Sequence, residues 1–493
     1  MICQLPCCSF TLPPDLNYHR VVECQRVIVI SDLHISAGRL DDFDSELEVH
    51  FVHFLEELGR RKYPLELVVN GDFLDFVQAP PYGGPDLQSQ SNDKVPLCFT
   101  QAQSRQKLSA IHASHEPTFQ ALDQFLTANA DNALVVLPGN HDADFFWSGV
   151  RDDFVRYVSG EDKSVARRIR IHLESAYQPS QCPEVWIEHG QQYDPINSFF
   201  ISKYPYWSGN NPPILSDGSQ QRLYACLGTR FLIDYLNDLD ADYPFVDNVK
   251  PFSRFVRLFL TSAADSRFGP VRAAVASWRM LKYLSTLAVT HPKDLLGISQ
   301  IEDRTGSDLI ERLKAMPKVN KEQFSRINNA FPGDRDLSLL LSDSSEQERI
   351  LQWLASHLEL LDEPQAVSDP SLLSIDGTDD QYLSLWKGFQ MNETALLVDA
   401  AIKLLNANRG RRIQLVVMGH THEPLERPEG LKYFNTGSWT RYYRFGGDDH
   451  PSAWSILQDQ SYKTFPYKLN YTEIDIHNPS AAEMICFEGR DHD

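Results

Sequence analysis

The chain has 493 residues, of which 42% are hydrophobic, and its formal net charge is −21. This apolar share is sufficient for a globular core, and the length predicts two or three structural units. No apolar run reaches the roughly 18 residues of a membrane-spanning helix, which argues against a transmembrane segment. The strong acidity disfavours nonspecific binding to nucleic-acid phosphates, although a local basic groove would still permit it.

The start of the chain and the cysteines indicate a cytoplasmic setting. Residues 1–25 are predicted to form an N-terminal extension, and they lack the basic region and the apolar stretch of a signal peptide. The 8 cysteines are scattered over the chain, mostly singly. This usage is typical of reduced thiols rather than of a disulfide framework.

Five short apolar runs rich in Val, Ile and Leu predict strands that are buried on both faces. They occupy residues 27–30, 67–69, 134–137, 185–187 and 415–418. Each run is followed by a polar segment with metal-binding chemistry. These segments are Asp32-Leu33-His34, Gly71-Asp72, Gly139-Asn140-His141-Asp142, His189-Gly190 and Gly419-His420-Thr421-His422. Because open α/β sheets carry their sites beyond the carboxyl ends of the strands, we expect the segments to converge at one edge.

Each segment taken alone has an ordinary structural explanation, such as a turn after a strand or a buried histidine. The ordered set instead predicts a metal centre. It offers two carboxylates, one amide oxygen and several imidazoles, a mixture that suits Mn²⁺, Fe or Zn²⁺ better than Ca²⁺ or Mg²⁺ alone. Two ions about 3.5–4 Å apart need a bridging ligand, and a carboxylate is a suitable one.

A long stretch separates the fourth polar segment from the fifth. We therefore predict a core formed by residues 26–200 and 395–475, interrupted by a mainly helical insertion or cap at 200–394 and followed by a C-terminal tail at 476–493. Apolar residues at helical spacing predict helices within 221–239 and 252–287, and a core helix at 392–406.

Charge within the insertion is segregated. Residues 250–294 are strongly basic, whereas residues 334–380 are acidic. Three interpretations remain open: the basic helices receive a phosphate that carries a greasy or bulky group, they lie on an anionic membrane surface, or they pair with the acidic segment and only pack the cap.

Three large side chains follow the last polar segment. Trp439 is expected to contribute to packing. Arg441 and Arg444 have two interpretations, as clamps that bind phosphate oxygens through a planar guanidinium fork or as ordinary surface residues.

The order of the five segments resembles the calcineurin-like metallophosphoesterase superfamily, and their style is closest to bacterial UDP-2,3-diacylglucosamine hydrolase-like members. The resemblance implies an α/β fold whose core is two packed mixed β-sheets flanked by helices (α-β-β-α), here with a large mainly helical insertion. The bacterial group usually has Arg where this chain has His141. We therefore carry over the reaction class and not the substrate.

The resemblance also implies roles for individual residues. The first metal would be held by Asp32, His34, Asp72 and His422. The second would be held by Asp72 as the bridging ligand, Asn140, His189 and His420. His141 would face the phosphate and stabilise or protonate the leaving oxygen, and Asp142 would orient it. Asp75 would lie beside the ligands without binding a metal.

The implied function is hydrolysis of a phosphodiester, pyrophosphate or phosphomonoester by a metal-bridging hydroxide, on a substrate that is lipid- or nucleotide-linked. Mn²⁺ is the expected metal, with Fe, Zn²⁺ or Ni²⁺ as alternatives. An anionic membrane surface or a lipid-linked substrate would meet residues 250–294. The competing hypotheses are a metal-dependent nuclease, a protein phosphatase, and a partner-binding module with residual phosphoesterase activity.

Overall fold

A computed structural model describes most of the predicted core. The residues described are 25–81, 99–194, 197–199, 207–217, 220–226, 248–250, 393–406, 413–444 and 462–490, with single positions or pairs between 228 and 237. The basic segment at 250–294 and the acidic segment at 334–380 therefore fall outside the described residues, except for Lys250.

The larger of two mixed sheets has six strands in the order β14-β13-β1-β2-β3-β4. Four of them are parallel: β1 (Arg26–Ile30), β2 (Leu65–Asn70), β3 (Ala133–Leu137) and β4 (Ile169–Ile171). The strand β13 (Tyr467–Asp475) runs antiparallel to β1, and β14 (Glu483–Arg490) runs antiparallel to β13.

The smaller sheet has four strands in the order β10-β11-β9-β5. Three are parallel, namely β5 (Val185–Ile187), β9 (Leu415–Met418) and β11 (Tyr433–Asn435), and β10 (Leu425–Glu426) is antiparallel to β11. Two short pairs stand apart from both sheets. They are β6 (Ile214–Asp217) with β7 (Gln220–Leu223), and β8 (Val249–Lys250) with β12 (Tyr443–Arg444).

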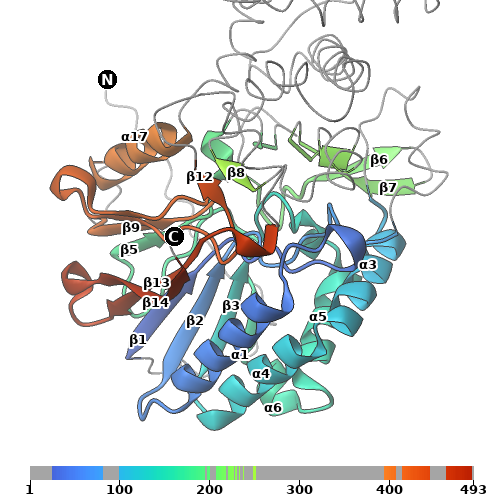
Figure 1. The fold of residues 1–493 in the computed structure, drawn as a ribbon, viewed down its shortest axis with the longest axis horizontal. Helices are drawn as coiled ribbons and strands as arrows, with labels where there is room; N and C mark the ends of the chain where they lie inside the picture. Colours follow the sequence, from blue (N-terminus) through green and yellow to red (C-terminus); the bar gives the residue numbers. More distant parts are fainter. Residues whose placement is uncertain are drawn as a thin grey trace, which may run out of the picture.

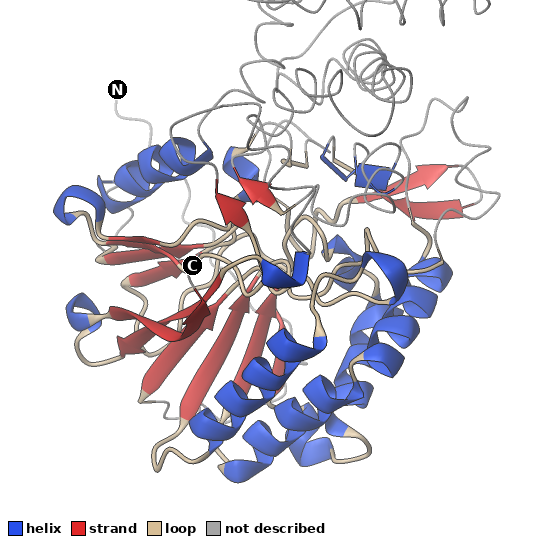
Figure 2. Cartoon of the chain, viewed as in Figure 1, coloured by secondary structure: helices blue, strands red, loops and turns tan. Residues whose placement is uncertain are grey.

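Helices cover the outer faces of the two sheets (Figures 1 and 2). The larger sheet is covered by α1 (Ser45–Gly59), α3 (Gln101–Ser114), α4 (Glu116–Ala128), α5 (Ser148–Ser159) and α6 (Lys163–Ala166), and the smaller sheet by α17 (Glu393–Asn406). Side chains cap the first two helices: Asp44 accepts hydrogen bonds from the first turn of α1, and Thr100 forms a capping box with Gln103 in α3. None of the described helices is both long enough and apolar enough to cross a membrane.

Alternate residues of each central strand enter different cores. In β1, Ile28 and Ile30 pack in the cluster that faces the helices, whereas Val27 and Val29 pack between the two sheets. A separate cluster joins α17 to the outer face of the smaller sheet. The predicted burial on both faces and the predicted arrangement of two mixed sheets between helices are therefore confirmed.

Two predicted boundaries differ from the structure. The expected tail at 476–493 is wrong over Glu483–Arg490, because β14 pairs with β13 and extends the larger sheet. The helix predicted from residue 221 is wrong at its start, where Gln220–Leu223 pairs with β6 in a hairpin. The rest of the predicted helical insertion lies outside the described residues, apart from a few positions.

Arg441 is neither a phosphate clamp nor a surface residue. Its side chain has an exposed fraction of 0% and lies over the Tyr467 ring. Its Nε donates to Asp44 Oδ2 at 2.7 Å, and its Nη2 donates to Glu46 Oε2. The buried guanidinium thus ties the segment after β11 to the first turn of α1, and the side chain of Arg444 is not described.

We expect Arg441→Leu to lower the free energy of unfolding by about 3 kcal/mol, because it leaves two carboxylates beside a buried apolar side chain. Thermal or urea unfolding would measure the loss. The matched control is Arg60→Leu, since Arg60 is exposed and pairs only with Glu56 one turn earlier, and its loss should stay below about 1 kcal/mol. Equal losses in the two variants would contradict the assigned role of Arg441.

A buried histidine joins the α3–α4 junction to α1. His115 donates from Nε2 to Asp41 Oδ2 at 2.8 Å and from Nδ1 to Glu48 Oε1 at 3.2 Å. Burial opposes its charge, but the two carboxylates outweigh this effect and raise the pKa of His115 to about 9. The imidazolium form is therefore favoured in the fold.

This raised pKa predicts how stability depends on pH. The folded pKa is higher than the usual value of 6.5, so the stabilisation is complete below pH 6.5 and is lost as the pH rises through about 9. We expect His115→Gln to lower the free energy of unfolding by about 3 kcal/mol at pH 6 and by much less at pH 10. A loss for His115→Gln that stayed constant between pH 6 and 10 would refute this explanation.

Candidate metal centre

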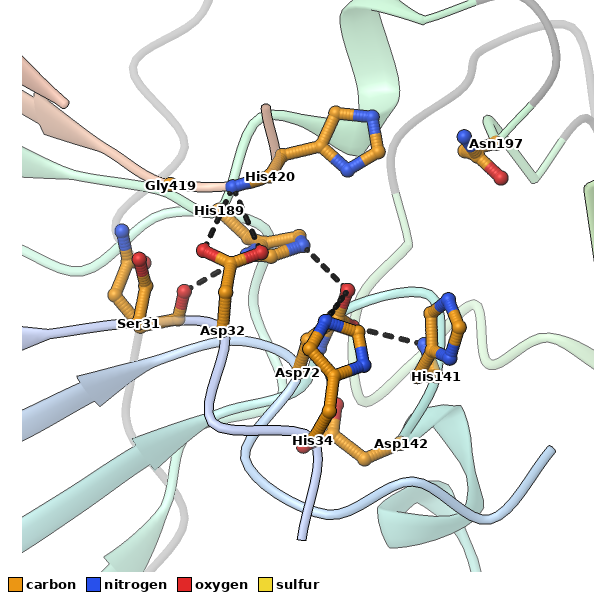
Figure 3. Close-up of polar contacts among 12 residues, drawn as sticks. Ser31, Asp32, His34, Asp72, His141, Asp142, His189, Asn197, Gly419 and His420 are labelled. Carbon is orange, nitrogen blue, oxygen red and sulfur yellow. Dashed lines mark hydrogen bonds and ion pairs between the residues drawn. The ribbon is translucent and has the colours of Figure 1, made fainter. Parts of the chain in front are cut away.

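The five predicted polar segments meet beyond the carboxyl ends of the strands that precede them. The parallel register places Ile30 beside Val69 and Asn70 beside Leu137. The loops after β1, β2 and β3 therefore begin next to one another along the same edge of the larger sheet. The segments after β5 and β9 reach the same place from the smaller sheet, as Figure 3 shows.

Hydrogen bonds connect these segments directly to one another. The backbone N–H of Asp32 donates to the carbonyl of Gly71 at 3.1 Å, and the N–H of His420 donates to Asp32 Oδ2 at 2.9 Å. Asp72 Oδ1 accepts from the N–H of His141 at 2.8 Å. Each loop is thus held by a neighbouring loop and not only by its own strand.

The side chains form three groups whose ligand atoms lie within 4.8 Å of one another. The groups are Asp32, His34 and His422; Asp72, His189 and His420; and His34, Asp72 and His141. The first two groups correspond to the two halves of the predicted metal centre. Asp72 is not in the first group, but its Oδ2 lies 3.2 Å from His189 Nε2 in one half and 3.8 Å from His34 Nε2 in the other, so one carboxylate is close to a histidine of each half.

The distances show how closely the nitrogen and oxygen atoms approach. His34 Nε2 lies 3.0 Å from His422 Nε2, and His422 Nε2 lies 3.4 Å from Asp32 Oδ1. His189 Nε2 lies 3.2 Å from Asp72 Oδ2 (Figure 3). Imidazole nitrogens and carboxylate oxygens at such separations are arranged as ligands of a common cation would be.

Two buried atoms test whether a metal would fit. Among the residues that the structure describes, Asn140 Oδ1 finds no hydrogen-bond partner, and His189 Nε2, although close to Asp72, makes no hydrogen bond of acceptable geometry. An unsatisfied buried acceptor costs free energy, and such a group in a native fold calls for an explanation such as a bound ion. Because both atoms belong to the predicted ligand set, the residues present fit a divalent cation.

The backbone of the site is strained at the predicted ligands. Five of them adopt a left-handed conformation that is uncommon for residues other than glycine. They are Asp32 (φ 55°), His34 (φ 50°), Asp72 (φ 49°), His420 (φ 71°) and His422 (φ 58°). Such strain tends to occur at functional sites, where the surrounding structure holds it in place.

The glycines of two motifs allow close approach to the carboxylates. A Cβ on Gly139 would lie 2.2 Å from Asp72 Oδ1, and one on Gly419 would lie 2.5 Å from Asp32 Oδ2. Any larger residue at either position would displace a predicted ligand. The two glycines therefore belong to the motifs for a steric reason.

The electrostatics favour cations. Burial opposes protonation of His189, but the nearby Asp72 and Asp32 raise the pKa of His189 to about 9. Burial likewise opposes ionisation of Asp72, which is 1% exposed, yet the surrounding histidines hold its pKa well below its usual value. The negative charge of the two carboxylates thus attracts positive charge to this edge of the sheets.

The residue that orients His141 is Asp75 and not Asp142, which corrects our expectation. His141 Nδ1 lies 2.6 Å from Asp75 Oδ2. The carboxylate of Asp142 instead accepts from the backbone N–H groups of Phe73 and Gly139. Burial and the nearby Asp72 raise the pKa of Asp142 to about 7. Asp142 therefore shapes the loops, while Asp75 contacts the imidazole.

Sequence reasoning missed the contact between Asp194 and His420. Asp194 Oδ2 lies 3.1 Å from His420 Nε2. The sequence feature that could have indicated this contact is the short distance along the chain, because Asp194 follows His189 by only five residues. The sequence alone does not show that the turn after His189 points toward the fifth segment.

The comparison with protein families agrees with this geometry. Residues 25–243 match the calcineurin-like phosphoesterase family, and the matched range contains four of the five polar segments. No curated protein and no solved structure matches the chain. Family match, sheet arrangement and ligand groups agree on one identification: residues 25–243 form a domain of the calcineurin-like phosphoesterase family, whose members are metal-dependent hydrolases of phosphoric esters.

Proposed function

We propose that this chain hydrolyses a phosphate ester with the help of two divalent metal ions. The first would be held by Asp32, His34, Asp72 and His422, and the second by Asp72, Asn140, His189 and His420. The observation that carries the proposal is the position of Asp72, whose carboxylate belongs to the group with His189 and to the group with His34.

Such ions, when bound, would polarise phosphoryl oxygens and would lower the pKa of a bound water molecule to near neutrality. The chain itself supplies the general acid. His141 has its Nδ1 held by Asp75, so its Nε2 is the nitrogen left for the substrate's leaving oxygen. The carboxylate of Asp75, 2.6 Å from Nδ1, favours the protonated form of the imidazole, as a general acid requires.

Mn²⁺ is the metal that we propose, with Fe, Zn²⁺ or Ni²⁺ as alternatives, because the donors combine carboxylate, amide and imidazole groups. The proposed substrates are phosphodiesters, pyrophosphates or phosphomonoesters linked to a lipid or nucleotide. We also propose a cytoplasmic setting, which is supported by Cys182 and Cys226, two thiols that form no disulfide within the described part of the chain. Contact of residues 250–294 with a lipid-linked substrate or an anionic membrane stays a prediction.

The first test is metal content. We expect Asp72→Ala to lower the Mn²⁺ bound per chain from two ions to fewer than one, because the variant removes a ligand of both ions. Elemental analysis after equilibration with Mn²⁺ would measure this loss. Circular dichroism would check that the fold is retained, and Asp162→Asn, at the exposed start of α6, is the matched control that should keep both ions. Two ions retained in Asp72→Ala would remove the support for a shared carboxylate.

The second test separates proton transfer from metal binding. We expect His141→Ala to keep its Mn²⁺ and to hydrolyse bis(p-nitrophenyl) phosphate about 10²–10⁴ times more slowly, the usual range for loss of a general acid. Turnover number and metal content would be measured on the same samples. If the variant instead lost its metal, His141 would be a ligand, and its assignment as a proton donor would be wrong.

A further inference from the structure

The family resemblance assigns His420 as a metal ligand but assigns no role to the carboxylate that contacts its ring. The side chain of His420 is buried, and its two ring nitrogens face different neighbours. Figure 3 shows one ring nitrogen on the side of Asp72 and His189 and the other on the opposite side of the ring. The outer nitrogen, Nε2, lies 3.1 Å from Asp194 Oδ2.

We propose that Asp194 is a positioning residue that fixes the orientation and tautomer of His420 for the second metal ion. An ionised carboxylate only accepts hydrogen bonds, so the hydrogen must lie on Nε2 of His420. The Nδ1 atom then keeps its lone pair for a cation on the side of Asp72 and His189. This role presupposes the two-ion function proposed above.

The turn that carries Asp194 is itself held firmly. Glu188 is 1% exposed, and its carboxylate accepts from Tyr193 Oη at 2.7 Å and from Gln192 Nε2 at 2.9 Å. Asn197 Nδ2 donates to Asp194 Oδ2 at 2.6 Å. The bonds of Glu188 hold the residues just before Asp194, and the bond from Asn197 holds the carboxylate of Asp194 itself. A fixed Asp194 carboxylate limits the orientations available to the His420 ring.

Asp194 does not act as a ligand in this arrangement. The group around the second ion contains Asp72, His189 and His420, and Asp194 is not among the residues whose ligand atoms lie within 4.8 Å of one another. It contacts the nitrogen of His420 that faces away from the group. Carboxylates in this outer position typically change metal affinity by about 10- to 100-fold when they are removed.

The other half of the centre shows the same arrangement. His34 Nε2 faces His422, whereas His34 Nδ1 lies 3.2 Å from Asp75 Oδ2. One histidine of each half thus has its outer nitrogen held by a carboxylate outside the ligand set. Asp75→Ala therefore provides a matched comparison that should act on the first ion.

The experiment compares Asp194→Ala, Asp194→Asn and Asp75→Ala with the unmodified chain. Binding of each Mn²⁺ is measured by equilibrium dialysis, and electron paramagnetic resonance distinguishes a coupled pair of ions from a single ion. We expect Asp194→Ala to weaken one of the two Mn²⁺ sites by about 10- to 100-fold and to replace the pair signal with that of a single ion. Asp194→Asn keeps an acceptor oxygen and should lose less.

A second measurement needs no metal. Nitrogen-15 NMR of labelled histidines, with His420 assigned through His420→Gln, reports which ring nitrogen carries the hydrogen. We expect Nε2 to be protonated in the unmodified chain and a mixture of tautomers in Asp194→Ala. The retained melting temperature of the variant would exclude general misfolding.

The outcomes separate this role from the proposed function. An unmodified chain that binds fewer than two ions would refute the two-ion function. A chain that binds two ions while Asp194→Ala also binds two with unchanged affinities would refute the role of Asp194. Equal weakening of both ions in Asp194→Ala would also overturn it, because a positioning effect through His420 must be selective.

Discussion

The burial of unlike charges at one edge of two sheets is the constraint on which the remaining structure depends. Asp32 and Asp72 are almost completely buried, and a buried carboxylate is unfavourable unless other groups compensate for it. Backbone N–H groups from neighbouring loops and imidazoles from four segments provide this compensation. The strand ends, the tight loops and the close-approach glycines all serve to bring those groups within reach.

Much of this centre could be predicted from the sequence because its determinants are local. A short β-branched run followed by Asp, His or Asn specifies both a buried strand and a polar group at its end, and the parallel register then brings the ends together. Asp32 lies in a group with His34 and His422, and Asp72 lies in a group with His189 and His420, whereas the contact of Asp72 with the first set is through His34 alone. Their roles in metal binding remain proposals that only metal measurements will decide.

The features that sequence reasoning missed depend on long-range geometry. Asp75 and Asp142 are both close to His141 in space, and only the direction of the loop decides that Asp75 contacts its ring while Asp142 turns toward backbone N–H groups. Arg441 is buried by a partner almost 400 residues earlier in the chain, which residue type alone cannot reveal. The strand β14 is half exposed and has no regular alternation of apolar residues, so its pattern gave little indication of a strand.

The pairing of β1 with β13 has a consequence for the order in which the protein assembles. β1 lies between β2, which follows it after α1, and β13, whose residues are translated more than 400 positions later. The backbone N–H of Trp439 also donates to the carbonyl of Asp32. During synthesis, the loop that carries Asp32 and His34 therefore leaves the ribosome while one edge of its strand is still unpaired. β13 can pair with that edge only when nearly the whole polypeptide has been made. The contacts that complete the centre last are therefore those between residues far apart in the sequence.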